Sequence, residues 1–353
     1  MLIGTPTADI LQRPWSEGHA TNGIVAGPAM KGRGNRPPLV SLIVPVLNEA
    51  RAIPLFLESI TATLKDGCFQ YEILFVDDGS SDETLSMLNE VCKSNHHVRV
   101  ITFTRNFGKE AAISAGLDFS RGDVAIPIDV DLQDPPELIP AFVALWKQGF
   151  DVVYGVRKHR HADSFLKRNT AANFYRMFNR FSSTKLPENA GDFRLLDRRV
   201  VEVLRRLPER TRFMKGLYAW VGFRTASVDY SRPARCAGQT KWKPWMLWNF
   251  ALEGLCGFST LPLRAWTYIG LSIAVCAFLY ALFIAVRTVW LGVEVPGYAS
   301  ILTSIMFFSG VQLVTLGVIG EYIGRLFQEA KGRPLYIVDS VIEADNGGFA
   351  AGN

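Results

Sequence analysis

Apolar runs of strand length alternate with segments of helical pattern over residues 39–157, and this alternation limits the architectures open to the chain. The runs are apolar at consecutive positions, which is typical of strands buried on both faces of a parallel sheet. The helical segments between them would cover those faces. The runs read "LVSLIVPVL", "YEILFVDDGS", "VRVITFTRNFG", "DVAIPIDVD" and "FDVVYGVR". The sequence therefore predicts an α/β domain over residues 39–238 with a Rossmann-like, mostly parallel sheet.

Polar and charged residues follow each apolar run at the point where the strand should end. In open α/β sheets, ligands bind at the carboxyl ends of the strands. A concentration of charge at that edge therefore indicates a binding site. The residues concerned are Asn48, Glu49, Asp77, Asp78, Arg105, Asn106, Asp129, Asp131 and Arg157.

The stretch "AIPIDVDLQDPPE", residues 125–137, is the most acidic of these strand ends. If the strand continues through it, Asp129, Asp131 and Gln133 share one face, because strand side chains alternate. Mg²⁺ or Mn²⁺ binds a few carboxylates and completes its shell with phosphate oxygens and water. We therefore expect Asp129 and Asp131 to hold a divalent metal. A solvated strand end before a Pro-Pro turn is the alternative reading.

Several cations follow the last apolar run, and arginine matches the geometry of phosphate oxygens. Each of them alone could equally be a solvated surface charge, so the cluster carries the interpretation. No Ser, His or Cys constellation for covalent catalysis stands out. That pattern fits a phosphate monoester as the nucleophile, because it is largely dianionic at neutral pH. The cations are Arg157, Lys158, Arg160, Lys167 and Arg168.

Two long apolar segments, 264–292 and 299–325, occupy the C-terminal third. Each can span a hydrocarbon core of about 30 Å, so we expect transmembrane helices at 264–291 and 299–324. Buried core helices are the alternative. Basic residues cluster before the first span, from Lys241 to Arg264, and after the second, from Arg325 to Arg333, whereas the connection between the spans carries only Glu294. The positive-inside rule then places the α/β domain and both termini in the cytoplasm of a multi-pass inner-membrane protein.

Three further segments complete the expected organisation. Residues 1–38 are rich in Gly and Pro and are expected to form a disordered tail. Residues 239–260 carry tryptophans beside lysines, which suits an amphipathic helix in the membrane interface, although a helix packed on the domain is an alternative. Residues 325–353 are expected to form a cytoplasmic tail.

The net charge of +5 suits an anionic membrane or phosphorylated substrates, and we expect no nucleic acid partner.

Ordered motifs in the chain resemble those of the family 2 glycosyltransferases with the GT-A fold. They are "VPVLNE", "VDDGSSDET", "RNFGKEAA" and "DVDLQDPPE". Later runs closely resemble the bacterial bactoprenol (undecaprenyl-phosphate) glucosyltransferases, kin of dolichol-phosphate mannose synthases: "NAGDFRLLDR", "FMKGLYAWVGF", "RCAGQTKW", "LWNFALEG" and "FSTLPLRAWTYIG". The resemblance covers about residues 39–338. Thr240 stands where many relatives have serine, and Val130 where they often have alanine.

The resemblance implies an enzyme that transfers glucose, with inversion, from UDP-glucose to undecaprenyl phosphate for cell-surface glycan modification. It implies catalytic roles for Asp131, Asp192 and Arg194, although Asp192 could instead be a cap or an ion-pair partner of Arg194. Nucleotide-sugar contacts are implied for Pro45, Asn48, Glu49, Asp77, Asp78, Asp129 and Gln133. Contacts to the acceptor phosphate are expected from Arg157, Arg160, Lys167, Arg168, Arg235 and Lys241.

Other functions are weighed against this one. The same lipid could receive another sugar, such as mannose or an aminoarabinose derivative. A processive polysaccharide synthase would carry a QxxRW-type motif and more spans, and neither is visible. A non-catalytic scaffold would not need the metal carboxylates, which are intact. A homo-oligomer and a functional link to a lipid-linked-sugar flippase are both compatible with the expected function.

Overall fold

A computed structural model describes residues 36–65, 67–157, 190–210, 212–230, 261–291 and 297–344. Its centre is an eight-stranded sheet with the order β7-β5-β6-β4-β1-β2-β3-β8. The strands are β1 Leu39–Val46, β2 Gln70–Asp77, β3 Val98–Phe103, β4 Val124–Pro127, β5 Val152–Arg157, β6 Ala190–Asp197, β7 Thr225–Tyr230 and β8 Val338–Glu343. The α/β prediction is confirmed.

The sheet is mixed. Its centre is parallel, because β1 pairs in parallel with both β2 and β4, and β2 with β3. Strand β6 runs antiparallel between β4 and β5, and β8 runs antiparallel along β3. The carboxyl ends of β1, β2 and β4 therefore lie side by side at one edge of the sheet.

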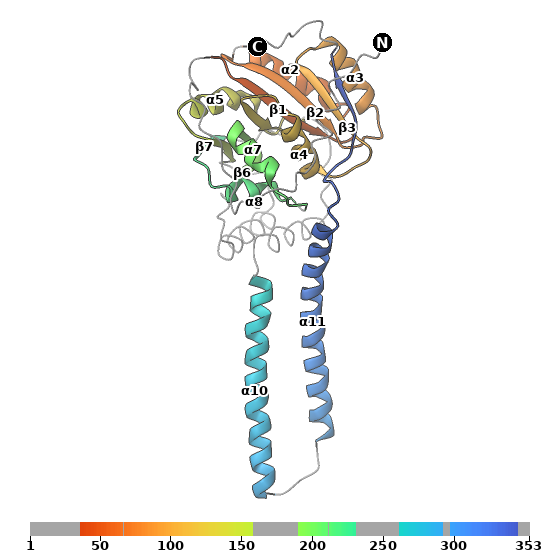
Figure 1. Cartoon of the computed structure of the whole chain (residues 1–353), viewed down its shortest axis with the longest axis vertical. Helices are drawn as coiled ribbons and strands as arrows, with labels where there is room; N and C mark the ends of the chain where they lie inside the picture. Colours follow the sequence, from red (N-terminus) through yellow and green to blue (C-terminus); the bar gives the residue numbers. More distant parts are fainter. Residues whose placement is uncertain are drawn as a thin grey trace, which may run out of the picture.

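Helices cover both faces of this sheet (Figure 1). Alternate residues of β1 belong to different cores: Leu42 packs in one cluster with α2, α3 and α5, and Ile43 in another with α4, α7 and α8. This two-sided burial explains why the strand sequence is continuously apolar. The helices are α2 Ala52–Lys65, α3 Thr84–Ser94, α4 Lys109–Phe119, η1 Pro136–Leu138, α5 Ile139–Lys147, α7 Arg198–Arg206 and α8 Met214–Trp220.

Strand β4 is shorter than the sequence pattern suggested. It ends at Pro127, and the chain turns through residues 129–133 with Leu132 at a φ of 56°. The prediction that Asp129, Asp131 and Gln133 share one strand face is therefore wrong. The backbone of Leu132 lies in the left-handed region, which is incompatible with an extended strand.

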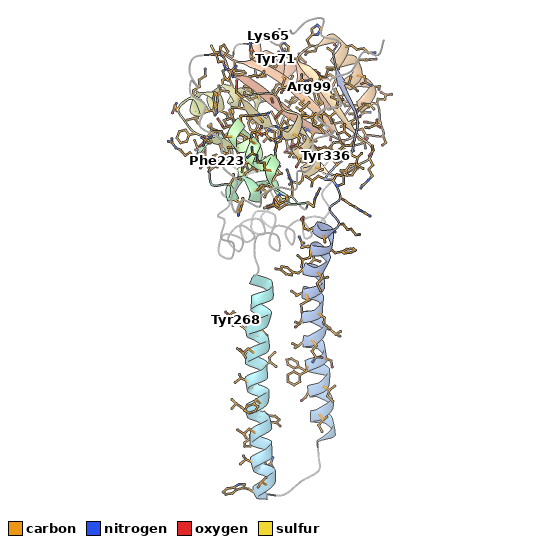
Figure 2. All side chains as sticks on the ribbon, in the orientation of Figure 1. Lys65, Tyr71, Arg99, Phe223, Tyr268 and Tyr336 are labelled. Atoms are coloured by element: carbon orange, nitrogen blue, oxygen red, sulfur yellow. The ribbon has the colours of Figure 1, made fainter. Side chains whose placement is uncertain are left out.

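Two long helices extend from one end of the domain: α10 Leu261–Leu291 and α11 Tyr298–Ala330 (Figure 1). Large apolar side chains project outward along both, including Tyr268 on α10 (Figure 2), which is 69% exposed. By length and composition, one stretch among the described residues, Phe307–Ala330, is apolar enough to cross a membrane, and Tyr268–Tyr280 is a shorter apolar stretch.

Strand β8 brings the chain after α11 back to the sheet. It pairs with β3, and the Tyr336 ring just before it stacks on Phe103 at 5.1 Å between centroids. The Tyr336 hydroxyl donates to Asp118 at the end of α4, at 2.6 Å. This strand lies within residues 325–353, for which only a tail was expected. It completes the same sheet that presents the candidate site.

Candidate active site

Two loops at the carboxyl edge of the sheet are tied together by hydrogen bonds. Asp77, at the end of β2, accepts hydrogen bonds from the N–H and the hydroxyl of Ser80. The Oδ1 of Asn48, after β1, accepts from the Ser81 N–H at 2.8 Å, and the Asn48 N–H donates to the Ser80 hydroxyl at 2.9 Å. Burial raises the pKa of Asp77, against the lowering effect of the Ser80 bonds. The structure thus brings Asn48 and Asp77 together.

Asp78 anchors the neighbouring loop. Its carboxylate is buried and accepts from the backbone N–H groups of Phe107, at 2.6 Å, and Gly108, at 2.9 Å. Burial raises the pKa of Asp78, and these backbone bonds act against the rise. Gly79 allows the loop after β2 to lie close to the β3–α4 loop. Its φ is 73°, and a Cβ at this position would lie 2.6 Å from the carbonyl carbon of Arg105. The β3–α4 loop is therefore held where α4 begins.

A network of ion pairs lies at the N-terminal end of α4. The Nζ of Lys109 is 2.6 Å from Oδ1 and 2.8 Å from Oδ2 of Asp129. The same Nζ is 3.5 Å from Oδ2 of Asp192, on β6, whose Oδ1 is 4.0 Å from the Nζ of Lys215, on α8. The network therefore joins the turn after β4 to β6 and α8.

The charges in this network hold Asp192 ionised. Burial acts to raise the pKa of Asp192, but Lys215, Lys109 and Arg194 outweigh it, so the pKa is lowered. Burial acts to lower the pKa of Lys109, and Asp129 and Asp192 outweigh it, so that pKa is raised. At neutral pH, both groups are therefore charged.

Two further charged groups, Glu110 and Arg194, lie beside the network. Burial raises the pKa of Glu110 to about 8, with a further contribution from Asp192, and its Oε2 accepts from the Met214 N–H at 3.3 Å. Arg194 is buried, donates to the Gly191 carbonyl at 2.5 Å and lies 4.2 Å from the centroid of the Tyr218 ring. Arg194 thus contacts the backbone next to Asp192 from the buried side. Asp192 itself pairs with Lys109 and Lys215, and the charge of Arg194 also acts on it.

The turn after β4 offers oxygen ligands. The Oδ1 of Asp131 accepts from the Gln133 N–H at 3.1 Å, and the Gln133 Oε1 is buried without a hydrogen-bond partner. The hydroxyl of Tyr230 donates to Asp134 at 2.7 Å and holds the end of the turn. Among the described residues, no three His, Cys, Asp or Glu form a metal-binding group. Carboxylate and amide oxygens are nonetheless the donors that Mg²⁺ and Mn²⁺ take together with substrate phosphates, so the turn fits such an ion.

The remaining predicted residues are placed only in part. Pro45 lies within β1, and Glu49 follows it with its N–H bound to the Thr84 hydroxyl. Arg157 is the last residue of β5 and is paired in register with Tyr230. The phosphate contacts expected from Arg160, Lys167, Arg168, Arg235 and Lys241 lie outside the described residues, as do residues 239–260.

Three charged residues in or beside the network were not predicted: Lys109, Glu110 and Lys215. A signal for the first two was present, because "GKE" lies shortly after a strand end at the expected binding edge. Lys215 has no comparable signal, since its approach to Asp192 depends on how α8 packs.

The acidic turn and the lysines lie at the carboxyl edge of the sheet, the edge at which open α/β sheets bind their ligands. Residues 41–205 match the family model of glycosyl transferase family 2, and residues 261–326 match that of the GtrB C-terminal hairpin. The chain belongs to glycosyl transferase family 2 and is a glycosyltransferase with a GT-A-like α/β fold. The resemblance drawn from its motifs is confirmed.

Curated relatives match almost over their whole length. The chain is 50% identical over 301 residues to the bactoprenol glucosyl transferase of Shigella phage SfX, which covers 85% of this chain and 99% of the relative. It is 49% identical over 302 residues to the prophage bactoprenol glucosyl transferase homolog of Escherichia coli K12, with 86% and 99% covered. Among solved structures, glucosyl-3-phosphoglycerate synthase from Mycobacterium tuberculosis with Mn²⁺ and UDP-glucose is 20% identical, with a TM-score of 0.40 and 64% and 81% covered.

Proposed function

We propose that this chain transfers glucose from UDP-glucose to a polyisoprenyl phosphate, with inversion at the anomeric carbon. The observation that carries the proposal is the Asp129–Lys109–Asp192 network at the carboxyl edge of the sheet, in a chain about half identical to bactoprenol glucosyl transferases. Carboxylates there can hold a sugar nucleotide, and lysines there can meet its phosphates.

The protonation state of Asp192 indicates whether it could act as a general base. A carboxylate with a lowered pKa is a poor proton acceptor, since a general base works best with a pKa near the working pH. The proposed nucleophile, a phosphate monoester, is largely dianionic at neutral pH and needs positioning more than deprotonation. We therefore assign Asp192 to orienting the sugar and the lysines around it.

Asp129 and Asp131, with Gln133, would hold Mg²⁺ or Mn²⁺ in this enzyme. When bound, such an ion supplies positive charge that stabilises the departing diphosphate. Lys109 and Lys215 add fixed positive charge on the side of Asp192. Asn48 and Asp77, joined through Ser80 and Ser81, form a polar edge suited to the base and ribose.

The donor is tested by a panel of labelled nucleotide sugars. Membranes containing the chain are incubated with polyisoprenyl phosphate and labelled UDP-glucose, GDP-mannose or UDP-aminoarabinose. We expect labelled lipid from UDP-glucose, and none from membranes lacking the chain. Label transferred only from another donor would contradict glucose as the sugar, and label from none would contradict the proposed reaction.

We further propose that α10 and α11 both cross the inner membrane, with the α/β domain on the cytoplasmic side. The outward apolar side chains of both helices and the basic residues that flank them support this topology. A reporter fused after Gly292 should be periplasmic, and one fused after Asn353 should be cytoplasmic. Finding the two reporters on the same side would contradict the two-span topology.

A further inference from the structure

Lys109 contacts the carboxylate that the proposed function assigns to a metal ion. Its Nζ lies within 2.8 Å of both oxygens of Asp129 and 3.5 Å from Asp192. Both partners of the closest pair are partly buried: the Lys109 side chain is 38% exposed and that of Asp129 33%. An ion binding to Asp129 would therefore have to displace a charge-assisted hydrogen bond.

The backbone fixes the position of this lysine. Lys109 is the first residue of α4, and Gly108 before it adopts a φ of 100°. The N–H groups of Phe107 and Gly108 both donate to the buried carboxylate of Asp78. The lysine stem thus leaves the backbone from an anchored point, which favours a maintained contact over a chance pairing of two surface chains.

Lys109 and a divalent cation are alternative partners for the same carboxylate. Both are positive, and the repulsion between them disfavours simultaneous contact with Asp129. A nucleotide diphosphate changes this balance, because its phosphate oxygens offer Lys109 a new anionic partner. Asp129 is then available to the metal.

We infer that Lys109 is a positioning residue that neutralises Asp129 until the donor diphosphate arrives, so that the metal ion binds tightly only together with the nucleotide. The inference rests on the proposed function for the diphosphate, but not for the sugar or the lipid. Its consequence is that removing the positive charge of Lys109 should strengthen metal binding in the absence of nucleotide.

The test measures Mn²⁺ binding to the full-length chain in detergent, by the electron paramagnetic resonance signal of unbound Mn²⁺, without and with UDP. Wild type should bind Mn²⁺ weakly alone and much more tightly with UDP. Lys109→Met should bind Mn²⁺ alone about tenfold more tightly than wild type, the lower end of the effect of a charged hydrogen bond. The extra tightening by UDP should shrink.

Lys215→Met is the matched control, because it removes the same charge from the same network but from the side of Asp192. We expect it to leave nucleotide-free Mn²⁺ affinity within about twofold of wild type, which leaves room for weak long-range effects. Lys109→Arg keeps the positive charge and should bind Mn²⁺ as weakly as the wild type in the absence of nucleotide. Adding Asp129→Asn to Lys109→Met should remove the gain. Thermal unfolding checks that each variant is folded, and Lys109→Gln replaces Lys109→Met if the latter is not.

Three results would overturn the inference. Wild type could bind Mn²⁺ equally well with and without UDP. The neutral variant at position 109 could show no gain, or one that persists when Asp129 is also replaced. Lys215→Met could increase Mn²⁺ affinity as much as Lys109→Met does, which would mean that the net charge of the site, and not the contact with Asp129, controls metal binding. Because neither sugar nor lipid is present, a failed transfer assay would leave this measurement unaffected.

Discussion

Asp131→Asn is expected to lower glucosyl transfer by about 10²–10³-fold, the usual cost of removing one preorganised charge-stabilising group. The fold should survive, because Asp131 lies in the turn after β4 and is not fully buried. The amide oxygen of asparagine can still accept the Gln133 N–H that Asp131 accepts at 3.1 Å. Transfer from labelled UDP-glucose and thermal unfolding, measured on the same preparation, check both statements.

Glu137→Gln is the matched control for this change. It removes the same charge six residues further on, from an exposed position on η1, and transfer should stay within about twofold of wild type. Excess chelator should abolish transfer by the wild type, and Mg²⁺ or Mn²⁺ should restore it. Undiminished transfer in chelator, or an equal loss in Glu137→Gln, would show that Asp131 does not act through a metal.

The central strands could be predicted from sequence because two-sided burial leaves a continuous apolar pattern. Strand β3 shows this most clearly, since all its residues are buried. Strand β6 was not predicted, because its sequence "AGDFRLLD" contains charged residues and no continuous apolar run. Strand β8 alternates between partly buried and exposed residues, and its pairing with β3 depends on contacts remote in the sequence.

The candidate site, like the sheet, was predicted from the sequence only in part. Charge at the strand ends correctly located Asp77 and Asp129 at one edge of the sheet, because parallel strands end on the same side. The apolar alternation of "IPIDVD" was misleading, since β4 ends at Pro127 and the positive φ of Leu132 turns the chain. The Asp192–Lys215 contact could not be predicted, because it depends on how α8 packs against β6.

A second large effect is expected in stability, at the buried ion pair between Arg99 and Glu72. Their side chains are 8% and 10% exposed, and the Nη1 of Arg99 donates to Glu72 at 3.0 Å. Glu72 also accepts from the Ser41 hydroxyl and the Arg121 N–H, so it is fixed within the fold. Arg99→Met would leave this carboxylate buried without its cation. Such a loss costs about 3–5 kcal/mol of unfolding free energy.

The same arginine binds β8. Its Nε donates to Glu343 at 2.9 Å, and Arg121 donates to Glu343 at 2.8 Å from an exposed side chain. Arg121→Met is therefore the matched control: it removes one cation from the same carboxylate, but at the surface. It should cost about 0–1 kcal/mol.

Chemical denaturation of the full-length chain in detergent, followed by tryptophan fluorescence, compares the two variants. In Arg99→Met, β8 should also become more sensitive to limited proteolysis, because it loses its link to the interior of the sheet. Equal destabilisation by both variants would mean that burial of the Arg99–Glu72 pair does not set its energy. Residues 331–337 connect α11 to β8, so greater proteolysis of β8 in Arg99→Met would show that the Arg99–Glu343 contact holds this C-terminal strand on the sheet.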